Sequence, residues 1–349
     1  MRSQLAGYPF AEAQRGESLF TRGLWPAFWI AAPGAGISPV FSAYRCRFSL
    51  ANDELVRLHV TGDERYQLFL DGVRLGRGPE RGDRWNWFVE PYDIQIPAGQ
   101  HVLSAMVFSL GESYAPHAQI GVKHGYFCCA EQLAAAGGAT ASSGEKTVAE
   151  KLSTGVGDWE AKLLDGYSFA PSRYTWAIGS CYVMDGKKFS WGFEKGDSDG
   201  WQTAVKMHQG AEGSIRYHAE IIQRLRTAML PAMKDTPWQG GKVRAIGLPE
   251  PVGEAIPYRT AESQPADLSK WQAFFEGKPL SIPANTAVRV LYDLDEYLCA
   301  YATLVVSGGA GAEISLGWAE SLYVEADAKT KGKRNEIEGK KFRGLEDRI

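Results

Sequence analysis

The segment RGPERGDRWNWFVEPY, residues 77–92, places an aspartate and an arginine next to two indoles. Asp83, Arg84, Trp85 and Trp87 are its most chemically suggestive members. Aromatic faces stack on the C–H surfaces of sugars, and Asp and Arg side chains hydrogen-bond hydroxyl groups. The segment could therefore bind a carbohydrate. The alternative, which we favour, is that both indoles pack onto a neighbouring domain.

Other residue types that support catalysis or metal binding occur without the required spacing. The six histidines show no metal-ligand spacing, and isolated histidines in strands are more often hydrogen-bonded polar groups than ligands. Asp197 and Asp199 lie in an aspartate-rich loop that could hold calcium, but the helix-flanked calcium loop is missing. No nucleophile elbow, phosphate-binding loop or dinucleotide fingerprint is present. We therefore assign no catalytic residue, no metal and no cofactor.

Composition narrows the class of protein. A length of 349 residues suggests two domains, and a formal net charge of -3 argues against a nucleic-acid partner. The content of 11 Trp and 39 Gly fits many short strands joined by glycine turns. No segment has the length and apolarity of a signal peptide or a membrane span, so we expect no membrane partner and a cytoplasmic location. The five cysteines lack a disulfide or zinc pattern and are expected to be buried thiols.

The alternation of apolar and polar residues predicts strands through most of the chain. Residues 44–50, 55–61 and 66–70 alternate in this way, and Asp71-Gly72 is a strong signal for a two-residue hairpin turn. Residues 25–30 are expected to form an edge strand, because they contain Pro26. Further strands are expected at residues 93–96, 101–110, 126–133 and 148–154. Residues 134–146 are small and polar, which predicts a mobile hairpin tip that proteases cut first.

These patterns predict an all-β protein with two antiparallel β-sandwich domains. Pro231 and Pro237 interrupt the segment after residue 222, so we place the domain boundary near Asp235. The first domain then covers residues 1–235 and the second covers residues 236–349. In the second domain, residues 301–307 and 312–318 are expected to form a hairpin around a glycine-rich turn.

The second half also carries a family resemblance. Asp293 to Glu296, the glycine-rich turn, WAESLY at 318–323, KGKRN at 331–335 and residues 339–347 follow one another in an order that resembles bacterial α-L-rhamnosidases. The matching region of that family is the β-sandwich region that precedes the catalytic domain. In the first half, YQLFLDGVRLGRGP and YDIQIPAGQHVLSAMV resemble the galactose-binding-like, or jelly-roll, modules of large glycosidases.

The resemblance implies a function. The chain would be the non-catalytic N-terminal part of a glycoside hydrolase that cleaves terminal α-L-rhamnosides. It would end before the helical (α/α) barrel that supplies the acid and the base of an inverting reaction. Its partners would be that C-terminal catalytic domain and a rhamnose-containing glycan. The alternative is a stand-alone carbohydrate-binding or adhesive β-sandwich protein, and the coding sequence downstream of Ile349 would distinguish the two.

The resemblance also implies that the second sandwich lacks its closing strand. We therefore expect residues 331–349 to be loosely held, and the isolated chain to self-associate or to be less stable than a longer chain carrying the barrel.

Overall fold

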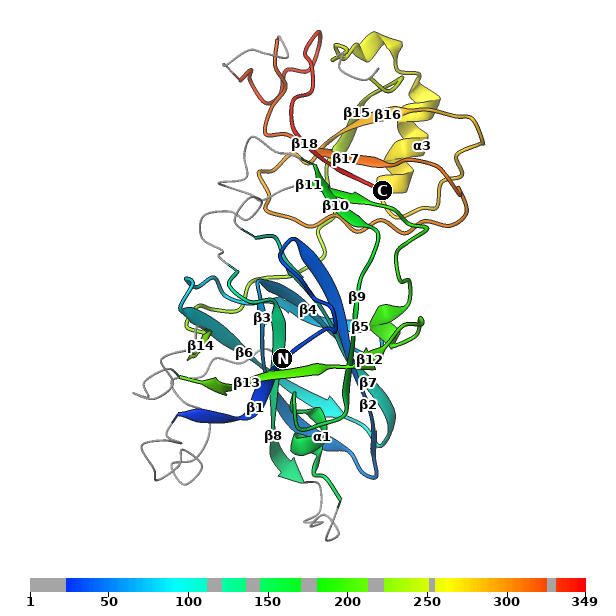
Figure 1. Cartoon of the computed structure of the whole chain (residues 1–349). Helices are drawn as coiled ribbons and strands as arrows, with labels where there is room; N and C mark the ends of the chain where they lie inside the picture. Colours follow the sequence, from blue (N-terminus) through cyan, green and yellow to red (C-terminus); the bar gives the residue numbers. More distant parts are fainter. Residues whose placement is uncertain are drawn as a thin grey trace. The chain divides into compact units, whose positions relative to one another are not determined.

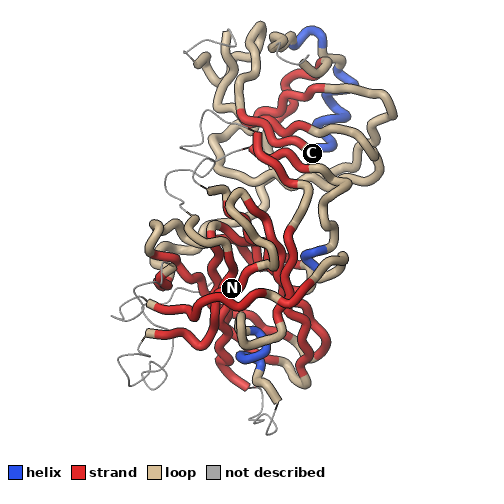
Figure 2. Tube along the Cα trace, in the orientation of Figure 1, coloured by secondary structure: helices blue, strands red, loops and turns tan. Residues whose placement is uncertain are grey.

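The computed structural model describes residues 23–111, 121–135, 145–170, 181–212, 223–250, 255–324 and 331–349. The chain divides into two compact units, Met1–Lys234 and Asp235–Ile349, drawn mostly in blue to green and in yellow to red in Figure 1. This division falls next to the boundary that the prolines around residue 235 suggest. Strands and loops dominate both units, and helices are few and short (Figure 2). The predicted all-β class is confirmed.

Unit 1 contains two six-stranded sheets. The first sheet has the order β13 (Val205–Ala211), β1 (Leu24–Ala31), β8 (Gly125–Ala135), β3 (Glu54–Asp63), β6 (Asn86–Ile96) and β14 (Arg224–Thr227). The second has the order β12 (Gln202–Thr203), β9 (Trp159–Leu163), β2 (Val40–Leu50), β7 (Gly99–Ser109), β4 (Arg65–Leu70) and β5 (Val73–Gly78). Neighbouring strands are antiparallel except β6 and β14, which are parallel.

The main core lies between these sheets because one face of each strand is apolar. In β2, Tyr44, Cys46, Phe48 and Leu50 are buried, whereas Arg47 and Ser49 are exposed. Alternate residues of β3 and β7 from the two sheets join the same buried cluster: Val56, Leu58, Val60, Leu103, Ala105 and Val107. Burial of two facing apolar surfaces is what stabilises a sandwich. The hairpin predicted at Asp71-Gly72 joins β4 to β5, with both residues at positive φ.

Strand β1 was expected at a sheet edge, and this prediction is wrong. It lies between β13 and β8, and its indoles Trp25 and Trp29 are buried. The register of β1 against β13 shifts between Leu24 and Phe28, so Pro26 lies where the ladder is already irregular. An interior strand tolerates proline at such a bulge because no ladder hydrogen bond is lost there.

Two further elements complete unit 1. Strands β10 (Tyr167–Ala170) and β11 (Cys181–Met184) form an antiparallel pair, and Tyr167 stacks on Phe41 of β2 with ring centroids 4.1 Å apart. Residues 148–154, predicted as a strand, instead begin with helix α1 (Val148–Leu152). Thr147 and Glu150 form a capping box at its N-terminus, which explains why the helix outcompetes a strand here. A short 3-10 helix, η2 (Phe193–Lys195), packs Phe193 beneath the second sheet.

Unit 2 has shorter elements. Strand β15 (Lys242–Gly247) pairs with β16 (Arg289–Asp293), and β17 (Ser315–Trp318) pairs with β18 (Leu345–Arg348), both antiparallel. Between β15 and β16 lie the 3-10 helix η3 (Thr260–Glu262) and helix α3 (Pro265–Phe275). The buried apolar cluster of the unit consists of Ala245, Tyr258, Leu322 and Ile337.

The sequence misjudged three features of unit 2. Residues 301–307 form no strand, so the predicted 301–318 hairpin is wrong, and β17 pairs instead with β18 about 30 residues later. Residues 345–348, in the stretch where no closing strand was expected, form that partner strand. Helix α3 was not predicted, although Pro265 at its start and Asp267 in its first turn are helix-start signals.

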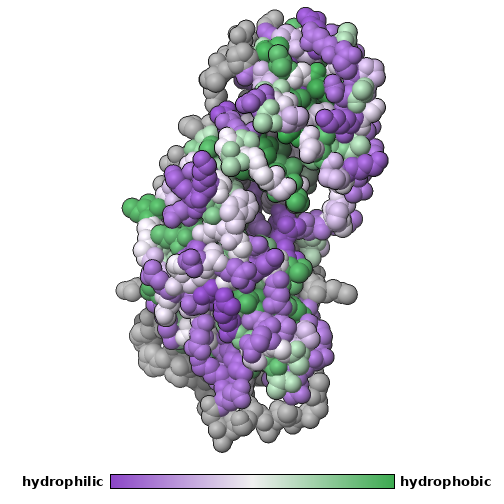
Figure 3. All heavy atoms as spheres, turned by 90° about the vertical axis from the view of Figure 1, so that its right-hand side faces the viewer, coloured by the Kyte–Doolittle hydropathy of each residue, from purple (hydrophilic) through white to green (hydrophobic). Residues whose placement is uncertain are grey.

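The surface and the cysteines complete the description. Hydrophilic residues cover most of the face drawn in Figure 3, and hydrophobic residues form smaller separate groups on it. Cys46, Cys128 and Cys129 are buried thiols as expected, whereas Cys299 is exposed. Among the described residues, no helix is long and apolar enough to cross a membrane. Residues 136–144 of the segment expected to be mobile lie outside the described part of the chain.

Candidate functional site

The segment that the sequence singled out divides into a surface part and a buried part. Asp83 accepts hydrogen bonds from the backbone N–H groups of Trp85 and Asn86, each at 2.8 Å, and from the Asn86 side chain at 2.9 Å. Its carboxylate therefore fixes the turn that leads into β6. These bonds leave the carboxylate less available to a ligand than its sequence position suggests.

The two indoles of this segment have different environments. Trp85 is 47% exposed, with the guanidinium groups of Arg84 and Arg224 at 5.5 and 5.9 Å from its ring centroid. Trp87 is only 3% exposed and packs with Trp25, Trp29 and Phe127. Trp87 offers no free face to a sugar, because it occupies an inward position of β6. Asp83, Arg84 and Trp85 thus stay together at the surface, and Trp87 is a core residue of unit 1.

A larger concave site lies elsewhere in unit 1. It is a pocket of about 790 Å³ built from four separate segments: residues 31–38 after β1, Leu110 and Gly111 after β7, residues 121–124 before β8, and residues 205–207 of β13. Ser38, Lys123, His124 and Lys206 give it polar groups, whereas Ile37, Val122, Val205 and Met207 give it apolar surface. Sequence reasoning missed this pocket because its parts are up to 176 residues apart, from position 31 to position 207.

Two buried carboxylates hold the pocket's wall in place. Glu64 accepts hydrogen bonds from the N–H groups of Leu110 (2.7 Å), Gly111 and Gly121 (both 3.1 Å). Asp63 accepts from the N–H groups of Val122 (2.9 Å) and Lys123 (2.8 Å), and from the Gln223 side chain (2.8 Å). Two adjacent residues at the end of β3 therefore anchor both chain segments, 110–111 and 121–123, that line the pocket.

Burial controls the protonation of this group of side chains. Desolvation raises the pKa of Asp63 to about 6 and that of Glu64 to about 7, although the hydrogen bonds that both carboxylates accept from N–H groups oppose the shift. Desolvation also lowers the pKa of His124 to about 4, so its imidazole is neutral at pH 7. His124 hydrogen-bonds Ser42 through Nε2, and its Nδ1 has no partner among the described residues. Asp63 Oδ1 and Gln223 Oε1 are likewise without a hydrogen-bond partner in the described part.

Within the described part of the chain, neither the remaining histidines nor the suspected calcium loop forms a metal site. His59 contacts Glu131 at 3.3 Å and His101 contacts Asp71 at 2.8 Å, which fits hydrogen-bonded structural roles. His117 and His218 lie outside the described residues. The backbone carbonyls of Asp197 and Asp199 accept hydrogen bonds from Trp201 and Lys162. In the described ranges no group of three or more His, Cys, Asp or Glu side chains could hold a metal ion.

Comparisons with known proteins return structures but no sequence family. No family model and no curated protein matches the chain. A GH78 family rhamnosidase of Bacillus sp. GL1 aligns with a TM-score of 0.42 and 21% identity over 64% of this chain and 21% of its own. The α-L-rhamnosidase from Dictyoglumus thermophilum aligns with a TM-score of 0.41 and 15% identity over 65% of this chain and 25% of its own. A Pleurotus ostreatus lectin in complex with GalNAc aligns with a TM-score of 0.31 and 13% identity over 60% of this chain and 50% of its own.

The coverage in these alignments is unequal. The chain spans about a fifth to a quarter of the length of the two rhamnosidases. All three TM-scores are below 0.5.

Proposed function

We propose that the chain is a non-catalytic β-sandwich part of an α-L-rhamnosidase-like glycoside hydrolase, and that unit 1 binds a rhamnose-containing glycan. The order of sequence motifs from Asp293 to Asp347 supports the family. The pocket anchored by Asp63 and Glu64 supports the binding role, and it is the observation that carries this proposal.

The chemistry of the pocket fits a deoxy sugar. Lys123 and Ser38 can exchange hydrogen bonds with hydroxyl groups. Rhamnose also carries a methyl group where most hexoses carry a hydroxymethyl group. Ile37, Val205 and Met207 provide apolar surface against which such a methyl group could lose its contact with water.

The positions of the carboxylates favour binding over hydrolysis. An inverting glycosidase needs two carboxyl groups far enough apart, about 6.5–9.5 Å, to admit a sugar and a water molecule. Asp63 and Glu64 are adjacent, fully buried and occupied by backbone N–H groups, and neither lines the pocket. They are suited to fixing the pocket's shape rather than to attacking a ligand.

Titration calorimetry of the whole chain with methyl α-L-rhamnoside tests the binding role. Ile37 is 97% exposed, so Ile37→Asp removes apolar pocket surface without disturbing the core. We expect it to weaken binding about fourfold or more, since burial of one methyl-sized group is worth about 0.8 kcal/mol. Val73→Asp is the matched control, because Val73 is 68% exposed on β5 and lies outside the pocket.

A second pair of variants tests the polar side of the pocket. Lys123→Gln should also weaken binding, whereas Lys188→Gln, at a side chain 70% exposed outside the pocket, should not. Equal affinities for both variants and their controls, or no saturable binding at all, would remove the binding role from this pocket.

A further inference from the structure

A separate polar pocket lies within unit 2. It has a volume of about 420 Å³ and is lined by Asp293, Asp295, Lys333, Arg334, Asn335 and Glu336. Asp293 ends β16 and Asp295 follows it, and the other four residues belong to one loop before β18. All six side chains are polar, so this site differs in character from the pocket of unit 1.

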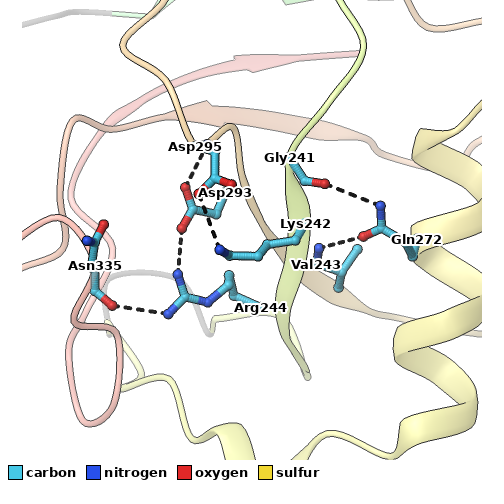
Figure 4. Close-up of polar contacts among 8 residues, drawn as sticks. All are labelled: Gly241, Lys242, Val243, Arg244, Gln272, Asp293, Asp295 and Asn335. Atoms are coloured by element: carbon cyan, nitrogen blue, oxygen red, sulfur yellow. Dashed lines mark hydrogen bonds and ion pairs between the residues drawn. The ribbon is translucent and has the colours of Figure 1, made fainter.

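The pocket is held by a network centred on Arg244 of β15 (Figure 4). Arg244 donates from Nη1 to Asp293 Oδ2 at 2.6 Å and from Nη2 to the backbone carbonyl of Asn335 at 3.1 Å. It therefore ties the end of β16 to the loop that carries Arg334. The side chains of Arg244 and Asp293 are only 23% and 18% exposed, which strengthens this charged pair relative to a surface pair.

Contacts on both sides of the pocket hold β15 and the loop at residues 333–336 in place. Gln272 of α3 accepts a hydrogen bond from the Val243 N–H at 2.9 Å and donates to the Gly241 carbonyl at 3.3 Å, which orients β15 (Figure 4). In the loop, Ile337 is 6% exposed and packs in the core of unit 2. The geometry of the pocket is thus set before any ligand arrives, a condition that lowers the entropic cost of binding.

The three carboxylates of the pocket form ion pairs with cationic side chains outside it, whereas its two cationic side chains are less strongly paired. Asp293 pairs with Arg244, Asp295 pairs with Lys242 at 3.2 Å, and Glu336 pairs with Lys340 at 2.9 Å. Among the described residues Arg334 has no carboxylate partner, and its guanidinium lies 5.4 Å from the ring centroid of Tyr297. Lys333 is 85% exposed, and its ion pair with Glu336, at 3.8 Å, is long and open to solvent, so it holds Lys333 weakly. The groups left available to a ligand are therefore mainly cationic.

We propose that this pocket binds an acidic saccharide through its carboxylate. The guanidinium of Arg334 has the planar fork that matches a carboxylate, and Lys333 adds a second positive charge beside it. The Asn335 side-chain amide, which makes no hydrogen bond within the described part, can donate hydrogen bonds to sugar hydroxyls or accept them, and the Asp295 carboxylate can accept them. The ring of Tyr297, 63% exposed, adds an aromatic surface next to Arg334 for sugar C–H groups.

The lining favours a saccharide over an acidic peptide. A peptide usually anchors apolar side chains in a groove, and none of the six lining residues is apolar. The site is also independent of the rhamnoside pocket, because it lies in the other unit and shares no residue with it.

The test compares two ligands that differ only in the carboxylate. Methyl α-D-galactosiduronate and methyl α-D-galactoside are titrated into the whole chain at low salt, and amide chemical shifts report where each binds. We expect saturable binding of the acid, with shifts at residues 333–336, and binding of the neutral sugar about tenfold weaker or absent.

Arg334→Gln should abolish the preference for the acid. Arg348→Gln is the control, since Arg348 is also exposed in unit 2 and lies outside the pocket. An unchanged amide spectrum outside the loop shows that each variant is folded. The rhamnoside titration of the same sample measures binding to the unit 1 pocket separately, so the absence of binding at one site can be told apart from the absence of binding at the other.

Four outcomes would overturn the proposal. They are equal affinity for the acid and the neutral sugar, equal effects of the two arginine substitutions, acetate binding as tightly as the sugar acid, and tighter binding of a triglutamate peptide. The third would indicate general attraction of small anions, and the fourth would indicate a peptide site.

Discussion

The two units of the chain are stabilised by different means. In unit 1, two long sheets bury a continuous cluster of large apolar side chains, among them Tyr44, Leu58 and Leu103, all at most 1% exposed. In unit 2, the buried apolar cluster has four members, and only Tyr258 among them is aromatic. Apolar burial supplies most of the free energy of folding, so unit 2 must rely more on polar contacts.

The surface of unit 2 leads to the same conclusion. Leu248 is 74% exposed, Val305 is 90% exposed, and Tyr301 is 62% exposed. Two partly buried ion pairs supplement the small apolar cluster of this unit, Arg244 with Asp293 and Arg289 with Glu250. The pocket of unit 1 is therefore anchored by two carboxylates within a unit that has a large packed core, whereas the pocket of unit 2 depends mainly on the Arg244–Asp293 ion pair.

The largest expected effect on stability distinguishes Trp87 from Trp85, the two indoles of the segment at residues 77–92. Trp87→Ala should destabilise unit 1 by about 3–5 kcal/mol, because it opens a cavity beside Trp25 and Trp29. Trp85→Ala should cost less than about 1 kcal/mol, because the Trp85 side chain is already half exposed. Urea denaturation monitored by amide exchange in β3 and β8 measures both. Similar losses for the two variants would show that Trp87 is not a core residue.

The next effect concerns unit 2. Arg244→Met should destabilise this unit by about 1.5–3 kcal/mol, since it leaves the partly buried Asp293 carboxylate without its charged partner. Amide exchange in β15 and β16 should accelerate while exchange in β3 stays unchanged. Arg348→Gln, which removes an exposed pair with Glu346, should cost less than about 1 kcal/mol. A loss of protection in both units after Arg244→Met would contradict the independent stabilisation of the two.

A smaller effect is the pH dependence of unit 1. The folded-state pKa values of Asp63 and Glu64, about 6 and about 7, lie above their values in an unfolded chain. Between about pH 4 and pH 7 these two carboxyl groups hold more protons in the folded state than in the unfolded state, so their contribution to stability falls as pH rises. The lowered pKa values of His59, His124 and His208 act in the opposite direction. We expect the contribution of the two carboxyl groups to fall by about 1–2 kcal/mol between pH 6 and pH 7.

Two variants identify the source of this slope. Glu64→Gln should make stability rise more with pH than it does in the unchanged protein, although the mean stability will fall because an amide cannot accept three N–H groups in the same way. Glu54→Gln, at the opposite end of β3, should leave the slope as it is. A slope left unchanged by both Glu64→Gln and Asp63→Asn would assign the pH dependence to other groups.

Local patterns in the sequence predicted unit 1 well. Alternation in residues 44–50 and the Asp71-Gly72 turn act over a few residues, so strand identity and hairpin register follow directly from them. The capping box of Thr147 and Glu150 was a local signal too, and it outweighed the apolar run that suggested a strand.

Longer-range relations were beyond the reach of these patterns. The partner of β17 is β18, and nothing local to Ser315–Trp318 distinguishes that pairing from a hairpin with residues 301–307. The proline of β1 is tolerated because of a register shift against β13, which is distant in sequence. Both pockets combine separate segments, so only Asp83, Arg84 and Trp85 were identifiable as surface candidates, and the inward position of Trp87 required the register of β6.

The central claim, that the chain binds a rhamnoside without cleaving it, is tested by one experiment on one sample. The whole chain is mixed with 4-nitrophenyl α-L-rhamnoside while amide shifts and release of 4-nitrophenol are followed together. The account predicts saturable shifts at residues 121–124 and 205–207 and no release of nitrophenol above the uncatalysed rate. Turnover that survives purification and disappears on Asp63→Asn or Glu64→Gln would contradict it.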